Sequence, residues 1–353
     1  MSITVHERPG VYSSYAASAA VSTGAGRKNV GLAVWMESPA KNMWNISRYE
    51  DAVAAFGAEH GDNATVLIRL LLQNGAAQVM VFPVKGSDLT DYQTAFEMMA
   101  GTEDISLAVC DSTVLEVQQA LRDSIHAASN AQRERIAVVA GGVDEDVAQL
   151  VERAGRLNSE RVVLVAPGCV DGQEQSLSGI QLAAAVAGAI AGQTDPAIPL
   201  GGAQLTGLYG LACRYDDSQM DVLIRGGVTV AESVGGVVSV VRGVTTRTTT
   251  DGAADSTWRD LSAILVVDDV IPAIRNALKS RFRRAKNTAQ SRGAIRSQVV
   301  LELENKLARE IITGYENVSV SADGEEPTRC LVDFSFTVTH GINQIWLSAH
   351  ITV

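Results

Sequence analysis

Residues 135–166 read RIAVVAGGVDEDVAQLVERAGRLNSERVVLVA, and this stretch indicates the fold class. The apolar runs at 135–140 and 161–166 are short and continuous, which is typical of strands buried on both faces of a parallel sheet. Between them, Asp144 is placed to cap a helix. That helix would carry its apolar residues on one face: Val147, Leu150, Val151 and Ala154. A strand–helix–strand unit of this kind predicts an α/β layer.

The same alternation continues towards both ends of the chain. Further apolar runs that predict buried strands lie at 30–36, 78–84 and 105–110. Amphipathic segments such as 63–74 follow or precede them and predict helices. We therefore expect residues 24–215 to form an α/β domain with a mostly parallel sheet.

The character of the sequence changes after residue 215. Residues 222–244 are rich in Val, Gly and Ser with strand-like alternation, and two helices are predicted at 272–289 and 297–313. Strands are predicted at 318–322 and 330–339. We expect residues 216–340 to form a separate C-terminal α+β domain.

Both ends of the chain differ from these two domains. Residues 1–23 contain Pro9-Gly10 and then a run of Ser and Ala with neither helical nor strand periodicity, so they predict an extended arm or a disordered terminus. Residues 341–353 alternate like a strand and predict a C-terminal arm. The predicted fold class is thus α/β plus α+β, with extended N- and C-terminal arms.

The composition limits the possible classes of protein. Aromatic residues make up 5% of the 353 residues while Gly contributes 31, so close packing is expected to rely on small residues. The net charge of −11 argues against a nucleic-acid-binding protein. No apolar segment predicts a signal peptide or membrane insertion, and synthesis in the cytoplasm is expected.

Motifs of catalysis are hard to find. The four cysteines show no metal-ligand spacing, and the five histidines form no HExxH pair, so neither a metal site nor a cofactor is predicted. Gly141-Gly142 follows a strand and opens a helix, where an anion could bind, but such turns are common for geometric reasons. Cys169 lies at the end of a predicted strand without a neighbouring activator. We expect no catalytic residue and no enzymatic activity.

One charged segment stands out from the acidic chain. Between Asp269 and Glu302 there is no acidic residue and there are eight basic ones. On a helix, one stripe of this segment consists of Arg275, Lys279, Arg283 and Lys286. A solvated helix face usually mixes both signs, so a purely basic stripe predicts an acidic partner surface; a merely solubilising face is the alternative.

Two stretches resemble one known family. Residues 7–12 (ERPGVY) resemble the opening of contractile tail sheath proteins of myophages and phage-tail-like bacteriocins. Residues 241–246 (VRGVTT), followed by 258–261 (WRDL) and 266–270 (VVDDV), are similar to a later segment of that family. The order of arm, α/β domain and α+β domain matches as well.

The resemblance implies a structural subunit of a contractile sheath, which stacks in hexameric rings as a helix around a tail tube and contracts to drive the tube through a target envelope. The α/β domain would lie outside and the C-terminal domain inside, where the basic stripe would bind the tube. The arms would add strands to neighbouring subunits. The residues expected in these contacts are Val5, Glu7, Val11, Tyr12, Ile345, Trp346, Leu347 and Ile351.

The implied partners are further copies of the chain, the tail tube protein, and baseplate and terminator or collar proteins. Neither nucleic acid nor a cofactor is implied, and the protein would be made in a bacterial host and become part of a phage tail or tail-like particle. Two alternatives stay open: a cytosolic α/β enzyme with a Rossmann-like domain, and another tail or baseplate structural protein.

Overall fold

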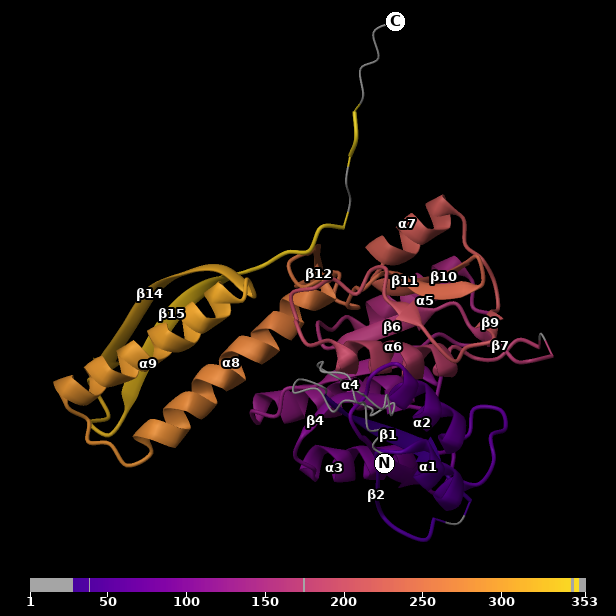
Figure 1. Ribbon diagram of the computed structural model, residues 1–353, viewed down its shortest axis with the longest axis horizontal. Helices are drawn as coiled ribbons and strands as arrows, with labels where there is room; N and C mark the ends of the chain where they lie inside the picture. Colours follow the sequence, from indigo (N-terminus) through magenta and orange to yellow (C-terminus); the bar gives the residue numbers. More distant parts are fainter. Residues whose placement is uncertain (1–27, 38, 174, 344–345, 349–353) are drawn as a thin grey trace, which may run out of the picture.

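The computed structural model describes residues 28–343, except 38 and 174, together with residues 346–348. Within this range the chain forms an α/β domain and a projecting unit of two helices and a β-hairpin (Figure 1). The long helix α8 (Leu261–Phe282) runs from one into the other.

A nine-stranded sheet forms the centre of the α/β domain, in the order β2-β3-β1-β4-β5-β6-β10-β11-β8. Its parallel part consists of β1 (Asn29–Trp35), β3 (Val79–Val84), β4 (Ile105–Cys110), β5 (Ile136–Ala140), β6 (Val162–Ala166) and β10 (Val228–Val234). The antiparallel edges are β2 (Trp44–Ile46), β11 (Val237–Arg242) and β8 (Gln204–Leu205). The predicted mostly parallel sheet is confirmed.

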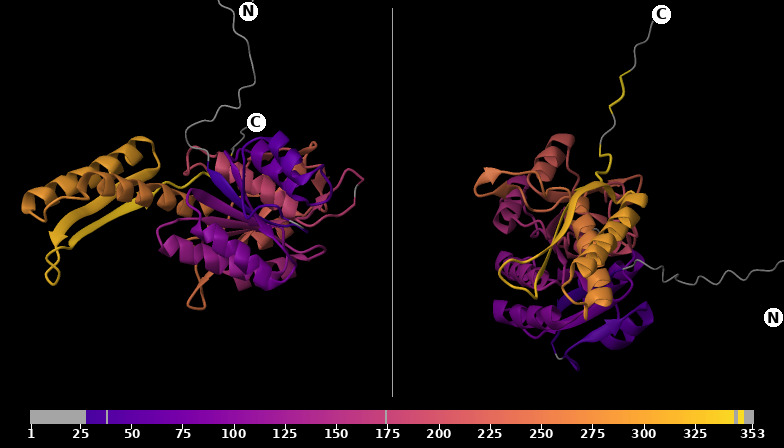
Figure 2. Two further views of the ribbon diagram at one scale, coloured as in Figure 1. Left: turned by 90° about the horizontal axis from the view of Figure 1, so that it is seen from below. Right: turned by 90° about the vertical axis from the view of Figure 1, so that its left-hand side faces the viewer.

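Helices cover both faces of this sheet (Figure 2). One hydrophobic core lies beneath α1 (Tyr49–Phe56), α2 (Ala64–Gln73) and α6 (Ile180–Gly192). The other lies beneath α3 (Leu89–Gly101), α4 (Leu115–Asn130), α5 (Val147–Leu157) and α7 (Asp217–Arg225). The short strands β7 (Cys169–Val170), β9 (Gly210–Leu211), β12 (Thr249–Thr250) and β13 (Ala253–Ala254) form two small ladders beside it.

Small residues allow a close contact between α2 and α6, as the composition predicts. Gly188 of α6 faces the end of α2, and a Cβ atom added there would lie 2.7 Å from the backbone oxygen of Leu71. A Cβ at Gly75 would lie 2.7 Å from the Cα of Gly192. The two helices therefore touch backbone to backbone, which larger side chains would prevent.

The α/β layer extends beyond the boundary predicted at residue 216. Strand β10 pairs in parallel with β6, and β11 pairs with β10 at a Gly235-Gly236 turn. Their alternating pattern predicted a separate domain because a half-buried edge hairpin alternates in the same way as an antiparallel sheet. In the structure, this hairpin instead belongs to the nine-stranded sheet and forms part of its antiparallel edge.

The projecting unit consists of α8, α9 (Ala289–Ala308), β14 (Ile312–Ala322) and β15 (Cys330–Val338). Its own core contains Val270, Ile274, Val299, Leu303 and Ile312. Helix α8 begins eleven residues before the predicted helix because Pro272 lies inside it and not at its first turn. Helix α9 begins and ends before the predicted bounds, and Ile312 and Thr313 already belong to β14. No helix of the described residues is both long and apolar enough to cross a membrane.

Candidate functional site

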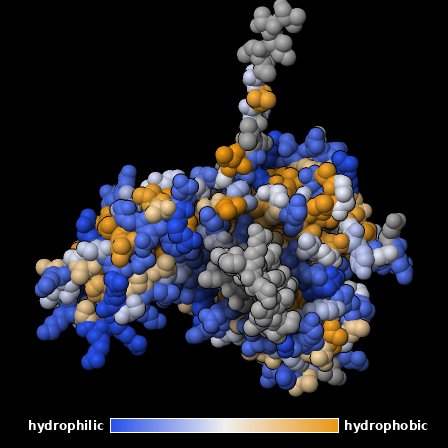
Figure 3. Space-filling model, in the orientation of Figure 1, coloured by the Kyte–Doolittle hydropathy of each residue, from blue (hydrophilic) through white to orange (hydrophobic). Residues whose placement is uncertain are grey.

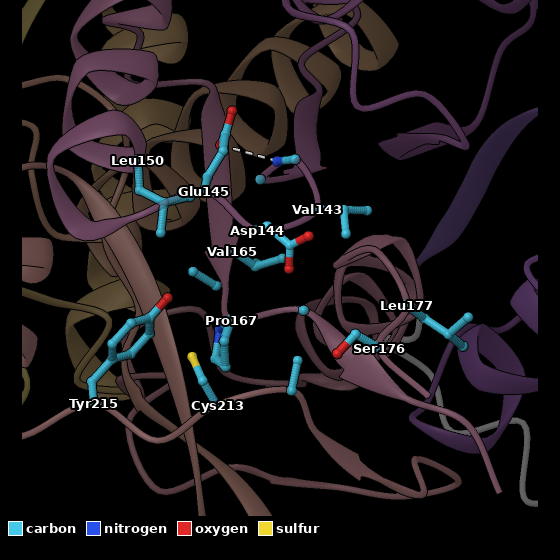
Figure 4. A pocket seen from close by; sticks show the side chains of 15 residues that line it. Val143, Asp144, Glu145, Leu150, Val165, Pro167, Ser176, Leu177, Cys213 and Tyr215 are labelled. Carbon is cyan, nitrogen blue, oxygen red and sulfur yellow. Dashed lines mark hydrogen bonds between the residues drawn. The ribbon is translucent and has the colours of Figure 1, made fainter. Parts of the chain in front are cut away.

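A pocket of about 290 Å³ opens where α/β enzymes place their ligands, at the carboxyl ends of β5 and β6 (Figure 4). The Gly141-Gly142 turn forms one wall, and Cys213 and Tyr215 form another. The sequence indicates that an anion could bind at the Gly141-Gly142 turn. The side chains around this turn decide whether it can.

The anion position at this turn is filled by the chain's own Glu145. The N–H of Gly142 donates to Glu145 Oε2 over 3.0 Å, and Arg153 Nε donates to the same oxygen over 2.9 Å. Helix α5 is capped by Asp146, two residues after the predicted Asp144, in a capping box with Gln149. A phosphate at this turn would meet a carboxylate, so the turn does not favour a nucleotide.

Glu145 also makes the stability of this loop depend on pH. Burial alone would raise the pKa of Glu145, but hydrogen bonds from Arg153 and Gly142 hold it below its usual value. A depressed pKa stabilises the fold above the unfolded-state value of about 4.3, and the contribution is lost as the pH falls through the folded-state value. We expect Glu145→Gln to lower the free energy of unfolding by about 1–2 kcal/mol at pH 7 and by less near pH 3.

Urea denaturation at several pH values measures this difference. Glu97→Gln is the matched control, because Glu97 is exposed on α3 and makes no ion pair with the described residues. A cost for Glu145→Gln that is constant from pH 7 to pH 3 would contradict the assigned ion pair.

The thiol singled out by the sequence is inert in this setting. Cys169 is fully buried, and burial raises the pKa of its thiol to about 12. A thiol with such a pKa stays protonated at neutral pH and is a poor nucleophile. Among the described residues, no group of three or more His, Cys, Asp or Glu side chains could hold a metal ion.

Among the described residues, the β14–β15 hairpin of the projecting unit has two unpaired edges. Within the described part of the chain it is a two-stranded sheet. Side chains of β15 alternate: Val332, Phe334 and Phe336 pack towards the helices, while Asp333 and Ser335 are exposed on the other face. Each free edge presents backbone N–H and C=O groups that can pair with another strand.

The basic stripe lies on α8 and on the turn to α9, and strongly hydrophilic side chains gather at this end of the molecule (Figure 3). Lys279, Arg283 and Lys286 are exposed, and none forms an ion pair with a described carboxylate. Arg275 differs, because it binds Glu134 through two hydrogen bonds of 2.6 and 3.2 Å. Of the four predicted residues, Arg275 is thus the one whose charge is already neutralised.

Most residues predicted for the arms lie outside the described residues: Val5, Glu7, Val11, Tyr12, Ile345 and Ile351. Trp346 and Leu347 are described, and they are 90% and 92% exposed. Both ends of the described chain contact the α/β domain at α6 or the loop after it. The N–H of Lys28 donates to the oxygen of Ala191 in the last turn of α6, and Gly341 contacts Pro199 in the loop that follows this helix.

Sequence analysis missed the side chains that anchor α8 to the α/β domain. Arg161 pairs with Asp268 and Glu134 pairs with Arg275, across 107 and 141 residues of sequence. A single sequence carries no signal for such distant pairs. Asp268 and Arg275 both lie within α8.

Comparisons with known proteins all lead to one family. A model of the phage tail sheath protein central domain matches residues 84–246, and a model of the phage tail sheath C-terminal domain matches residues 253–352. A curated tail sheath protein of Bacillus phage SP01 is 27% identical over 261 residues, which cover 70% of this chain and 43% of that protein. The chain therefore spans less than half the length of this relative.

Solved structures show the same fold. The helical sheath of the anti-feeding prophage in its contracted state aligns with a TM-score of 0.74 at 19% identity, covering 98% of this chain and 99% of that chain. A sheath tail protein from Desulfitobacterium hafniense aligns with a TM-score of 0.69 at 14% identity, covering 93% and 100% of the two chains.

Proposed function

Because this chain belongs to the phage tail sheath family, we propose that it is a structural subunit of a contractile tail sheath. In this role it polymerises helically around a tail tube and contracts to drive the tube through a target envelope. The observation that carries the proposal is the β14–β15 hairpin, a sheet of two strands with both edges free among the described residues. Such edges are normally an aggregation hazard, but in a polymer they are binding sites.

The arms are the natural occupants of these edges. Residues 1–27, fully extended, reach up to about 90 Å, and residues 342–353 reach about 40 Å. One segment leaves beside the last turn of α6 and the other beside the loop that follows it, both away from the free end of the hairpin (Figure 1). Val5, Val11 and Tyr12 of one copy, and Trp346, Leu347 and Ile351 of another, would then add strands to the hairpin of a third by β-augmentation.

Contacts of this kind generate an open assembly. An arm that binds a different surface on its neighbour forms a heterologous contact, which repeats as a helix when it does not close into a ring. The proposed partners are further copies of the chain, the tube, the baseplate and the terminator or collar proteins. The subunit would be made in a bacterial host and act in the tail particle without a cofactor, because new subunit contacts supply the free energy of contraction.

The proposed tube contact uses the exposed basic side chains Lys279, Arg283 and Lys286. The neighbouring β14–β15 turn carries Asp323, Glu325 and Glu326 and therefore bounds the basic surface on that side. Exposed charge pairs contribute only about 0.2–1 kcal/mol each. Many such contacts along the tube can hold it, and each is weak enough to break during contraction.

Charge reversal tests this contact. We expect Arg283→Glu/Lys286→Glu to reduce decoration of the tube while the sheath polymer still forms, with the larger effect at low salt because screening weakens surface charges. Lys85→Glu/Arg214→Glu, two exposed basic residues of the α/β domain, is the matched control. Counting decorated tubes in co-assembly mixtures by electron microscopy gives the answer, and unchanged decoration would disprove the assignment.

A further inference from the structure

Helix α8 is shared between the two folded parts of the subunit. Leu261, Ile264 and Leu265 at its start belong to the core of the α/β domain. Val270 and Ile274 belong to the core of the projecting unit. The orientation of this one helix therefore decides how the projecting unit stands on the α/β domain (Figure 1).

Two bidentate ion pairs join one face of α8 to the amino-terminal ends of two neighbouring strands. Asp268 accepts hydrogen bonds of 2.8 and 2.9 Å from Arg161, which precedes β6. Arg275 donates hydrogen bonds of 2.6 and 3.2 Å to Glu134, which precedes β5. Residues 268 and 275 are two helical turns apart and so lie on the same face.

The two pairs have opposite polarity. At the first, the helix supplies the carboxylate and the α/β domain the guanidinium, and at the second these roles are exchanged. A helix that slid or turned so that Asp268 approached Glu134 would bring two carboxylates together. Buried ion pairs add little net stability, but such an arrangement disfavours wrong orientations.

The section between the two pairs needs such support. Pro272 has no N–H, so the helix lacks its bond to the carbonyl of Asp268, and helices bend most readily at such a point. On the other side of α8, Asp269 pairs with Lys306 of α9. The helix is thus held on both sides of its weakest turn, and by both folded parts.

We propose that Glu134–Arg275 and Arg161–Asp268 fix the angle between the α/β domain and the projecting unit, and that they are positioning residues for assembly. The proposal rests on the proposed sheath function. The β14–β15 edges lie on the projecting unit, whereas the arms leave from the α/β domain. The angle set by α8 therefore determines where a subunit receives its neighbours' strands relative to where it sends its own.

The test exchanges the charges of one pair. Glu134→Arg and Arg275→Glu each place like charges opposite one another, and the double variant restores the pair with reversed polarity. We expect each single variant to lose ordered assembly and the double variant to regain it. Assembly with unchanged helical symmetry in both single variants, measured by cryo-electron microscopy, would overturn the proposal.

A second readout separates this proposal from the sheath function itself. Spin labels at Glu97 and Glu304, exposed on α3 and α9, report the distance between the two folded parts in the unassembled full-length chain, with Cys213 and Cys330 replaced by Ser. We expect one narrow distance distribution for the parent chain and the charge-swapped chain, and a broad or shifted one for the single variants. A broad distance distribution in the parent chain would overturn the proposed fixed angle even if cylinders form. A narrow distance distribution without polymers would count against the sheath function alone.

Where the single variants do not fold, Glu134→Gln/Arg275→Gln decides, because it removes the pair without placing like charges together. An undisturbed narrow distribution in that variant would equally overturn the proposal, and a broadened one would support it.

Discussion

Removal of residues 1–15 is expected to abolish polymerisation while the α/β domain stays folded. The described residues from Lys28 onwards build both faces of the sheet and its two hydrophobic cores. The link to the next subunit, in contrast, depends on a strand that this segment would donate. Main-chain hydrogen bonds of a whole strand would be lost at each contact, so the polymer should disappear and not merely weaken.

Far-ultraviolet circular dichroism measures whether the α/β domain stays folded, and sedimentation measures whether the chain polymerises. The matched control replaces residues 1–15 with a Gly/Ser segment of equal length, which should also fail to polymerise because the reach is kept and the strand is lost. A synthetic peptide of residues 1–15 should bind the truncated chain, and its binding should be lost when proline is placed in β15. A truncated chain that still forms cylinders would contradict the arm model.

Gly188→Ala is expected to destabilise the fold, and the same substitution at Gly155 to stabilise it. At Gly188 the new Cβ would meet the backbone oxygen of Leu71 at 2.7 Å, and a backbone atom cannot rotate away as a side chain can. Overpacking of this kind costs about 1–3 kcal/mol or more. At Gly155, on the exposed side of α5, no described atom outside the local helix backbone lies within 4 Å of the new Cβ. There the higher helix propensity of Ala should contribute about 0.5–1 kcal/mol.

Urea denaturation below the assembly concentration compares the two variants with the parent chain. We expect the free energy of unfolding to fall in Gly188→Ala and to rise in Gly155→Ala. Equal effects at the two glycines would show that α2 and α6 do not touch backbone to backbone, and the packing of that face of the sheet would have to be revised.

Local patterns predicted the part of the fold that local forces determine. Strands β5 and β6 are continuous apolar runs, and helix α5 between them has a strong apolar face. The strand–helix–strand unit can therefore be predicted from its own residues, without knowledge of the neighbouring strands. The elements that differ are those whose environment is not local. Residues 261–267 are apolar at every position except Ser262 because α8 there contacts two cores, and such a run cannot be assigned to helix or strand by periodicity.

The candidate binding surfaces also differ in how far neighbouring residues in the sequence predict them. The basic stripe was predictable because it lies in a segment, between Asp269 and Glu302, that holds eight basic residues and no acidic one. That Arg275 is neutralised was not, because Glu134 lies 141 residues away. The free edges of β14 and β15 also follow only from the topology, since a strand's sequence does not say whether it has one neighbour or two.

Electron microscopy of the purified protein at increasing concentration shows whether this chain polymerises into a sheath. We expect hollow helical cylinders or stacked rings, either from the chain alone or when tube and baseplate are supplied as nuclei. Only small discrete particles at every concentration and salt, with tube and baseplate present, would contradict it.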